Sequence, residues 1–345
     1  MIKIGIICPS EIAFRRFLPA IRKASDRIQF AGIAYANPEE WFGDLSIVSQ
    51  AAISEQQKRE RSKAQSFIDV SGGKVYKGYQ SLIESNDVDA VYLPLPPSLH
   101  YKWARLALEK GKHIFLEKPS TCFLSDTQDL VDIAIPKGLA IHENYMFVYH
   151  NQISELQEII SSGEKLGKPR LIRISFGFPR RAANDFRYNK SLGGGALLDA
   201  GGYTLRLASL LLGNTAQLST AQVSYDSDFE VDISGTATMV NENGLVAQLA
   251  FGMDNDYHCD IEVWGSKGTL TSGRILTAPV GCVPNYTLKQ NQEYTQHNFS
   301  EDDAFLKSIM RFADCCSSRR LREENYSIII RQAKYVNDFR KLACL

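Results

Sequence analysis

The triplet Glu117-Lys118-Pro119 carries the residue best suited to move a proton. It follows a short apolar run, residues 113–116, which we expect to be a strand. A lysine partly removed from water can give or take a proton near neutral pH, and its ammonium group can stabilise an alkoxide as it forms. Charged residues beside a proline are also common in surface turns, so the triplet alone has little specificity.

A second set of candidate groups lies in the block from Gly193 to Tyr203, GGGALLDAGGY. Its glycines allow a tight turn and a close approach of the backbone to a neighbour. Asp199 and Tyr203 are four residues apart, so a helix would place them on one face. There they could bind or protonate a sugar oxygen. The alternative is that Asp199 caps a helix and Tyr203 belongs to the core.

The turn after the first apolar run, residues 2–8, is where a dinucleotide-binding domain carries its glycine fingerprint, GxGxxG or GxGxxA. Here the turn reads CPSEIA, and only Ala13 fits. A helix N-terminus can still bind a phosphate through its free N–H groups, and Arg15 or Arg16 could offset the charge of Glu11. A turn without a ligand is the alternative. The candidate cofactor-binding residues here are Cys8, Pro9, Ser10, Glu11 and Ile12.

The second apolar run ends at Tyr35, Ala36 and Asn37, where a cofactor's adenosine ribose is expected. No Asp or Glu for the ribose hydroxyls stands at this end. The absence favours NADP slightly, because a carboxylate would repel the additional phosphate, and NAD stays open.

A third strand end carries PLPPSLH, residues 94–100. Ligands of open α/β sheets bind at the carboxyl ends of the strands. We therefore expect Leu95, Pro96 and His100 to join Glu117 and Lys118 at the cofactor. A satisfied structural histidine is the more common case for His100.

Alternation of strands and helices predicts the fold of the N-terminal part. Apolar runs at 2–8, 28–36, 88–95 and 113–116 predict buried strands, and residues 14–21 show a helical stripe that Pro19 should kink or restart. The segment 39–67 is polar and mostly helical by propensity. A helix at 125–134 and a strand at 140–143 complete this half. We predict a doubly wound parallel sheet, a Rossmann domain, over residues 1–120.

The remaining residues, 121–345, predict a C-terminal α/β domain with a large open mixed sheet. Its expected strands lie at 170–178, 217–225, 232–240, 245–251 and 258–264, with hairpin turns at Asn243-Gly244 and Ser266-Lys267-Gly268. Its expected helices lie at 152–161, 202–212, 303–314 and 324–342. The last helix could pack back on the Rossmann domain.

Composition excludes several classes of protein. The net charge is zero, which gives no support to binding of nucleic acid or acidic membranes, and the basic run at 58–63 is read as a solvated helix face. Seven cysteines without a CxxC spacing indicate reduced thiols, and no signal peptide or membrane span is found. We expect a cytoplasmic protein. The six histidines form no metal motif, so no metal is expected.

These segments together resemble the glucose–fructose oxidoreductase / inositol dehydrogenase family (Gfo/Idh/MocA). The resemblance covers nearly the whole chain. It is carried by the opening strand and turn, VDAVYLPLPPSLHYKWARLALEKGKHIFLEKP, HENYMFVYH, GGGALLDAGGY and VWGSKGTL. The combination of EKP with GGGALLDxGxY at this separation is specific to the family.

The resemblance implies a role for each candidate. Lys118 would lie near the nicotinamide and the reacting carbinol, with a cis peptide before Pro119, and Asp199 would be the family's aspartate. Tyr203 stands where the family usually has a catalytic histidine, as in the sugar ketoreductase branch. Pro97 stands where Asn is common and Val148 where Arg is frequent, so contacts to the cofactor or substrate could be lost there. The implied substrate residues are Tyr145, Arg187, Asp199 and Tyr203.

The resulting hypothesis is an NAD(P)-dependent oxidoreductase that moves a hydride between nicotinamide and a sugar or nucleotide-sugar carbinol or ketone. Arg180, Arg181 and above all Arg187 could meet the phosphates of a nucleotide sugar, or could be ordinary loop arginines. The family also implies a homodimer or homotetramer. Two alternatives remain: use of bound NAD for glycoside cleavage or elimination, and a non-catalytic dinucleotide-binding regulator.

Overall fold

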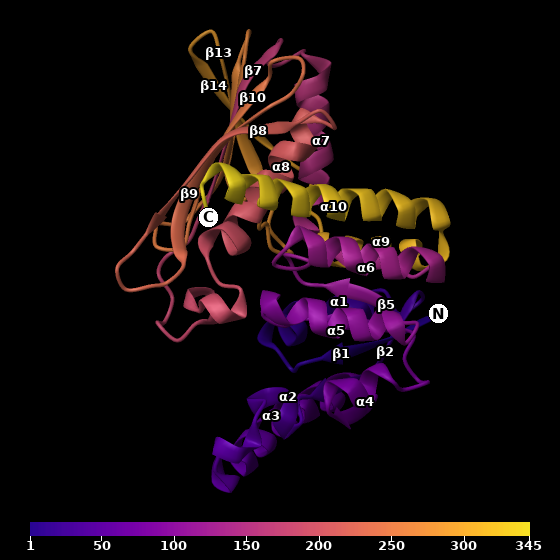
Figure 1. Ribbon diagram of the computed structural model, residues 1–345. Coiled ribbons are helices and arrows are strands. Elements are labelled where there is room, and N and C mark those ends of the chain that lie inside the picture. Colours follow the sequence, from indigo (N-terminus) through magenta and orange to yellow (C-terminus); the bar gives the residue numbers. More distant parts are fainter. The chain divides into compact units, whose positions relative to one another are not determined.

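The computed structural model describes residues 1–345, which divide into two compact units (Figure 1). Unit 1 comprises residues 1–121, 125–144 and 308–330, and unit 2 comprises residues 122–124, 145–307 and 331–345. The boundary expected at residue 120 lies next to the end of the first stretch. Unit 1 nevertheless takes in two later segments, because β6 (Ile141–Glu143) pairs with β5 (His113–Leu116) in its sheet. Part of the C-terminal helix α10 (Arg319–Leu342) also belongs to unit 1.

Unit 1 is built on sheet A, six parallel strands in the order β3-β2-β1-β4-β5-β6. This is the Rossmann strand order, with its switch point between β1 and β4. The predicted doubly wound sheet is therefore confirmed. The remaining strands are β1 (Ile2–Ile7), β2 (Ile28–Tyr35), β3 (Lys74–Lys77) and β4 (Ala90–Leu93). The edge strand β3 is short and half exposed, and its sequence contains no apolar run that would predict a strand.

The two faces of sheet A bury different side chains, because neighbouring residues of a strand point to opposite faces. On one face Val91, Ile114 and Ile141 pack in a core with Trp103 of α5 (Pro97–Glu109) and Tyr326 of α10. On the other face the rings of Phe17, Tyr92, Phe115 and Phe312 form a column, with Phe17 stacked on Tyr92 at 3.8 Å between ring centroids. Phe312 comes from α9 (Ala304–Ser317).

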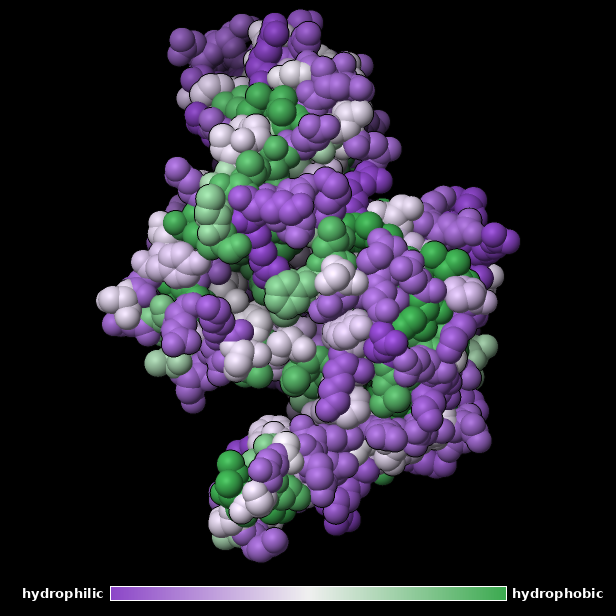
Figure 2. All heavy atoms as spheres, in the orientation of Figure 1, coloured by the Kyte–Doolittle hydropathy of each residue, from purple (hydrophilic) through white to green (hydrophobic).

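The helix after β1 restarts at Pro19, as the sequence predicts. Residues Ala13–Phe17 form a π-helical turn, and α1 (Leu18–Lys23) then begins with Pro19 in its first turn, where the missing N–H costs least. The polar segment that follows is broken into α2 (Pro38–Phe42), a 3₁₀ turn (Leu45–Ile47) and the long α3 (Gln50–Ser71). In the surface view hydrophobic residues gather in several places between hydrophilic ones, one of them at the lower left over the α2–α3 region (Figure 2), and Trp41 and Ile47 of this region are exposed.

Unit 2 is built on sheet B, eight strands in the order β14-β13-β12-β11-β7-β10-β9-β8. Only β7 and β10 pair in parallel, so the predicted mixed sheet is confirmed. Both predicted hairpins form: β9–β10 closes through Gly244, and β11–β12 closes where Gly265 donates to the Gly268 carbonyl at 2.8 Å. The strands are β7 (Pro169–Gly177), β8 (Gln217–Tyr225), β9 (Asp232–Val240), β10 (Val246–Gly252), β11 (His258–Gly265), β12 (Thr269–Ser272), β13 (Asn285–Gln290) and β14 (Glu293–Asn298).

One side of sheet B is covered by α8 (Gly202–Leu212), which packs on β7 and β10, and its core is largely aliphatic. α7 (Asn151–Ser162) contributes Ile153, Leu156 and Ile160 to the same core. The outward residues of the strands are mainly polar, with Tyr225, Trp264 and Tyr294 as exposed aromatic exceptions. All seven cysteines are free thiols, and none of the helices combines the length and apolarity that crossing a bilayer requires.

Candidate functional site

The turn after β1 keeps the backbone of a dinucleotide turn without its glycines. Cys8 has a φ of 78°, a conformation that normally selects glycine, and its N–H donates to the Ala34 carbonyl at 3.0 Å. Ser10 Oγ accepts from the Ala13 N–H at 3.3 Å at the start of the helix. Burial raises the pKa of the Cys8 thiol to about 11, so this thiol is neutral at physiological pH.

The charge of Glu11 is offset as the sequence suggested. Its carboxylate pairs with Arg15 at 2.6 Å, and both side chains are largely exposed. Ile12 is also exposed at 40%. The turn therefore presents no unpaired anion that would oppose a phosphate group.

Beyond the end of β2, the first turn of α2 carries two acidic residues, Glu39 and Glu40; Glu39 is exposed, and Glu40 is half-buried, three positions beyond Asn37. Its carboxylate accepts from three main-chain N–H groups: Asn37 at 2.9 Å, Tyr79 at 2.8 Å and Gln80 at 3.1 Å. Asn37 caps α2 in return by accepting from the Glu40 N–H at 2.8 Å. Glu40 is thus committed to the protein backbone, and Tyr35 and Ala36 are buried beside it.

Helix α3 brings a residue to this edge that the sequence reading missed. Within the basic run at 58–63, the arginines and lysines are exposed as expected, but Glu60 is 2% exposed. Its Oε1 atom accepts from Lys63 at 2.8 Å and from Arg59 at 3.1 Å. The basic residues of this run thus lie on a solvated face, while its one acidic residue points to the buried side of the helix.

His100 connects two strand ends of sheet A. Its ring is fully buried; Nε2 lies 2.8 Å from the Leu95 carbonyl and Nδ1 lies 2.8 Å from the Pro119 carbonyl. Burial lowers the pKa of His100, while the carbonyl contacts act in the opposite direction. The ring thus holds the segment after β4 beside the segment after β5. Pro96 and Pro97 begin α5, a position that suits proline.

The Glu117–Ser120 segment is fixed at both ends around Lys118. The Lys118–Pro119 peptide is cis, which confirms the expectation from the family resemblance. Before the lysine, Glu117 Oε1 accepts from the Tyr92 hydroxyl at 2.7 Å and from the Asn144 amide at 2.8 Å. After it, the Ser120 N–H donates to Glu143 at 2.7 Å. Tyr92 and Asn144 were not predicted, although a phenol inside the apolar run VDAVYLPL is a recognisable signal.

In unit 2, Tyr203 is half-buried in a set of aromatic rings. Tyr145 lies edge-on at 5.2 Å between ring centroids, Phe176 lies at 5.1 Å and Phe147 at 5.8 Å. The structure thus brings together Tyr145 and Tyr203, two of the predicted substrate residues. The helix predicted over residues 202–212 is confirmed as α8, and a π-helical turn, Leu197–Gly201, which contains Asp199, leads into it.

Arg187 and Asp199 form an ion pair in unit 2. Arg187 Nε lies 2.6 Å from Asp199 Oδ2, and Asp185 contacts the same guanidinium at 3.1 Å. Burial alone lowers the pKa of Arg187, but Asp199 and then Asp185 raise it above the ordinary arginine value. The side chains are 21% and 12% exposed, so the pair is largely withdrawn from water but still accessible to a ligand.

Two glycines of the block are required by close neighbours. A Cβ on Gly195, whose φ is +114°, would lie 2.3 Å from Asp232 Oδ1, and Asp232 Oδ2 accepts from the Leu197 N–H at 2.6 Å. A Cβ on Gly202 would lie 2.1 Å from the Tyr145 hydroxyl oxygen. The glycines therefore let a buried carboxylate and a phenol approach the backbone of this segment.

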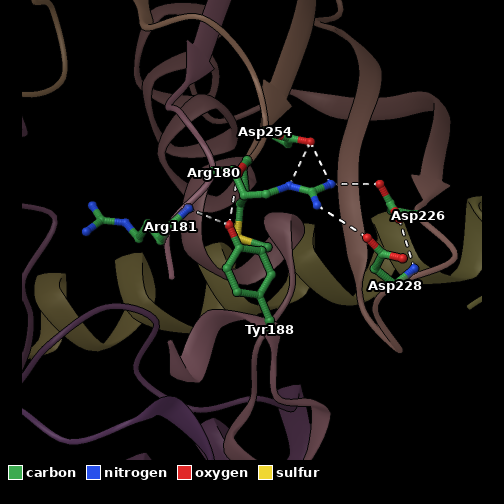
Figure 3. Close-up of polar contacts among 7 residues, drawn as sticks. Arg180, Arg181, Tyr188, Asp226, Asp228 and Asp254 are labelled. Carbon is green, nitrogen blue, oxygen red and sulfur yellow. Dashed lines mark hydrogen bonds and ion pairs between the residues drawn. The ribbon is translucent and has the colours of Figure 1, made fainter. Parts of the chain in front are cut away.

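Arg180, another candidate for the nucleotide phosphates, pairs with three carboxylates. Its guanidinium lies 2.8 Å from Asp226, 2.9 Å from Asp254 and 3.4 Å from Asp228 (Figure 3). The Arg181 guanidinium points away from this cluster and lies over the Phe178 ring at 5.2 Å. No group of three His, Cys, Asp or Glu residues is arranged to hold a metal ion.

Comparisons with known proteins agree over both units. The sequence model described as "Oxidoreductase family, NAD-binding Rossmann fold" matches residues 2–145, and that of the GFO/IDH/MocA C-terminal domain matches residues 153–271. A dTDP-3,4-didehydro-2,6-dideoxy-alpha-D-glucose 3-reductase of Streptomyces violaceoruber is 34% identical over 353 residues, covering 100% of this chain and 96% of the relative. The same enzyme of Actinomadura kijaniata is 34% identical, covering 98% of this chain and 95% of the relative.

A solved structure is similar over the whole chain. It is a 3-ketoreductase from Actinomadura kijaniata in complex with NADP and TDP-benzene, with a TM-score of 0.88, 33% identity, and coverage of 99% of this chain and 98% of the other.

Proposed function

This chain belongs to the Gfo/Idh/MocA family of NAD(P)-dependent oxidoreductases, and from that premise we propose that it reduces the keto group at C3 of a dTDP-linked deoxy keto-sugar. The observation that carries the proposal is the similarity, over essentially the full chain, to reductases of such sugars and to a 3-ketoreductase that binds NADP and a TDP compound.

The unit 1 residues fit a dinucleotide. The Cys8 turn keeps the glycine-like φ that lets a pyrophosphate approach a helix start, and Ser10 and Ala13 are small. The proposed cofactor residues are those of this turn, the end of β2, and the segments around Leu95 and Lys118. When bound, a reduced nicotinamide supplies the hydride.

NADPH is the proposed cofactor. The end of β2 itself, Tyr35, Ala36 and Asn37, carries no carboxylate, and the Glu40 oxygens beyond it accept from three main-chain N–H groups. A carboxylate available there would bind ribose hydroxyls and repel a 2′-phosphate. We expect kcat/KM with NADPH to exceed that with NADH; the reverse preference would contradict this assignment.

The chain's own groups complete the reduction. We assign Lys118 Nζ to stabilise the developing alkoxide, and Tyr203 Oη or Lys118 Nζ to give the oxygen its proton. Asp199 anchors a sugar hydroxyl, and Tyr145 packs beside the Tyr203 ring. Arg187, with part of its guanidinium left open by Asp199 and Asp185, is the proposed contact for the nucleotide phosphates; Arg181 is the next candidate.

The direct test is an absorbance assay of NADPH oxidation by the purified chain with dTDP-3,4-didehydro-2,6-dideoxy-glucose, compared with the same keto-sugar lacking the nucleotide. We expect turnover only with the dTDP-linked sugar, and a product carrying a hydroxyl at C3. Turnover with the free sugar alone, or cofactor that is bound but not consumed, would contradict the proposed substrate.

The proposed assembly is a homodimer or homotetramer that uses the open face of sheet B. On this face Arg173 lies 4.2 Å over the Trp264 ring and pairs with Glu262 at 3.2 Å. Light scattering of the purified protein should give a multiple of 38.6 kDa, and Trp264→Asp should reduce it. A monomer in both proteins would contradict the assembly. Free thiols throughout support the proposed cytoplasmic location.

A further inference from the structure

A buried chain of hydrogen bonds leads from the interior of unit 1 to the residue before Lys118. His142 Nε2 lies 2.8 Å from Ser308 Oγ, the Ser308 hydroxyl donates to Asn144 Oδ1 at 2.8 Å, and the Asn144 amide donates to Glu117 at 2.8 Å. His142 and Ser308 are fully buried, and Asn144 is 2% exposed. Apolar side chains would suffice to fill a core, so the burial of these polar groups suggests a role other than packing.

The donors of this chain have one consistent direction. Because Ser308 gives its proton to Asn144 Oδ1, its oxygen accepts from His142 Nε2–H. Asn144 Oδ1 therefore faces Ser308, and its Nδ2 must face Glu117. An amide cannot pass a proton onward as a hydroxyl can, so the chain orients groups and does not conduct protons.

The chain ends at the Glu117 carboxylate, which receives three hydrogen bonds. Glu117 Oε1 accepts from both Asn144 and the Tyr92 hydroxyl, and the Lys118 main-chain N–H also bonds to this carboxyl group. Two side-chain donors on the same oxygen favour the ionised acid, which only accepts. The Tyr92 ring is itself immobilised, stacked on Phe17 at 3.8 Å.

We infer that this chain fixes the Glu117 carboxylate as an immobile anion beside Lys118, so that His142, Ser308 and Asn144 are positioning residues for the lysine. The inference rests on the proposed function, in which Lys118 acts on the substrate oxygen. The lysine then takes one orientation before substrate arrives, which lowers the cost of ordering it in the transition state.

The charges that face Glu117 are few. Burial raises the pKa of Glu117 above its ordinary value, and hydrogen bonds from Tyr92 and Asn144 and the charge of Lys118 offset part of this rise. Cys8, near Tyr92, is a neutral thiol, and Glu143 is engaged by the Ser120 N–H. Activity that needs the ionised form is lost as the pH falls through the pKa of Glu117, so removing a donor should move this loss to a higher pH.

The test measures kcat and KM against pH for Asn144→Asp, Tyr92→Phe and Ser308→Ala. Asn144→Asp keeps the shape but places a second carboxyl against Glu117, so the two groups share a proton. In this variant we expect the pH at which kcat falls on the acidic side, the acidic limb of the profile, to move up by about one pH unit or more. We expect kcat at neutral pH to fall about 10- to 100-fold. KM for NADPH should change little. Tyr92→Phe and Ser308→Ala should shift the limb less, in the same direction.

Tyr326→Phe is the matched control, because this buried phenol donates to the Leu139 carbonyl in the same unit, away from Glu117. It should lower the melting temperature about as much as Tyr92→Phe and leave the pH profile unchanged. Lower melting temperatures without a shifted limb in Ser308→Ala and Tyr92→Phe would overturn the inference. Retained activity in Lys118→Ala would instead reject the proposed role of the lysine.

Discussion

In unit 1, the segment around Lys118 is held by hydrogen bonds from buried groups: Tyr92, Asn144 and His100 are almost wholly removed from water. In unit 2, the segment that carries Arg187, Asp199 and Tyr203 is held by ion pairs and by glycines packed against a neighbour. Buried hydrogen bonds tolerate little displacement, because a donor or acceptor that loses its partner there has no water to replace it. An ion pair that is largely withdrawn from water but still partly exposed, as Arg187–Asp199 is, can exchange a partner for a ligand.

This difference matches the roles proposed for the two clusters. A group that stabilises charge in the transition state must be fixed in advance, whereas groups that recognise a large substrate must exchange one partner for another. Arg187 is suited to such an exchange, because it pairs with Asp199 and Asp185 and still keeps some exposed surface.

The largest expected effect comes from removing the lysine. Lys118→Ala should lower kcat about 10²- to 10³-fold, as loss of one preorganised electrostatic group does in other enzymes, with little change in cofactor affinity measured by titration. Tyr203→Phe should also lower kcat. If both groups act on one oxygen, the double variant should lose much less than the product of the two single losses. Fully independent losses would show that they act on different steps.

A second prediction concerns the close contact in unit 2. Gly202→Ala places a methyl group 2.1 Å from the Tyr145 hydroxyl oxygen, so we expect about 3 kcal/mol of destabilisation in urea unfolding, the upper end for overpacking. Gly202→Ala combined with Tyr145→Phe should recover part of this loss, because the clashing oxygen is gone. Equal stabilities of the single and double variants would mean that this contact does not limit the segment.

Two arginines of unit 2, Arg187 and Arg180, allow a comparison between an ion pair withdrawn from water and an exposed one. Arg187→Met leaves Asp199 and Asp185 without their cation, and should cost about 2 kcal/mol of unfolding free energy because the pair is largely shielded from water. Arg180→Met removes an exposed partner of three aspartates and should change stability little. KM for the dTDP-sugar should rise in Arg187→Met alone; a rise in Arg180→Met of equal size would contradict this distinction.

The smallest effect tests the turn in unit 1. Cys8 holds a positive φ that disfavours any side chain, so Cys8→Gly should be more stable than Cys8→Ala by about 1 kcal/mol. Both variants lose the thiol, which makes the alanine the control for the lost packing. Chemical denaturation of the two proteins measures the difference, and equal stability would indicate that the left-handed conformation is unstrained here.

Much of the architecture was predictable because its signals are local. Strands β8 and β9 lie at the predicted residues, since alternation along one strand reports the exposure of its two faces. The edge strand β3 and the late strands β13 and β14 were not predicted, because exposed and short strands have no apolar run. The burial of Glu60 was not predicted for a related reason: its neighbours in sequence are charged, and only packing shows which side of the helix is buried.

The sequence by itself determined the Rossmann half, the lysine at the end of a strand, and the glycine block with its aspartate and tyrosine. These features depend on periodicity and on spacings of a few residues, which can be recognised in the sequence itself. Only the tertiary structure decided that Ser308, 164 positions from Asn144, orients the amide beside Glu117, and that Arg180 belongs to three aspartates. A hydrogen bond or ion pair between residues far apart in sequence leaves no repeating pattern in the sequence. It can be identified only once the fold has brought the two partners together.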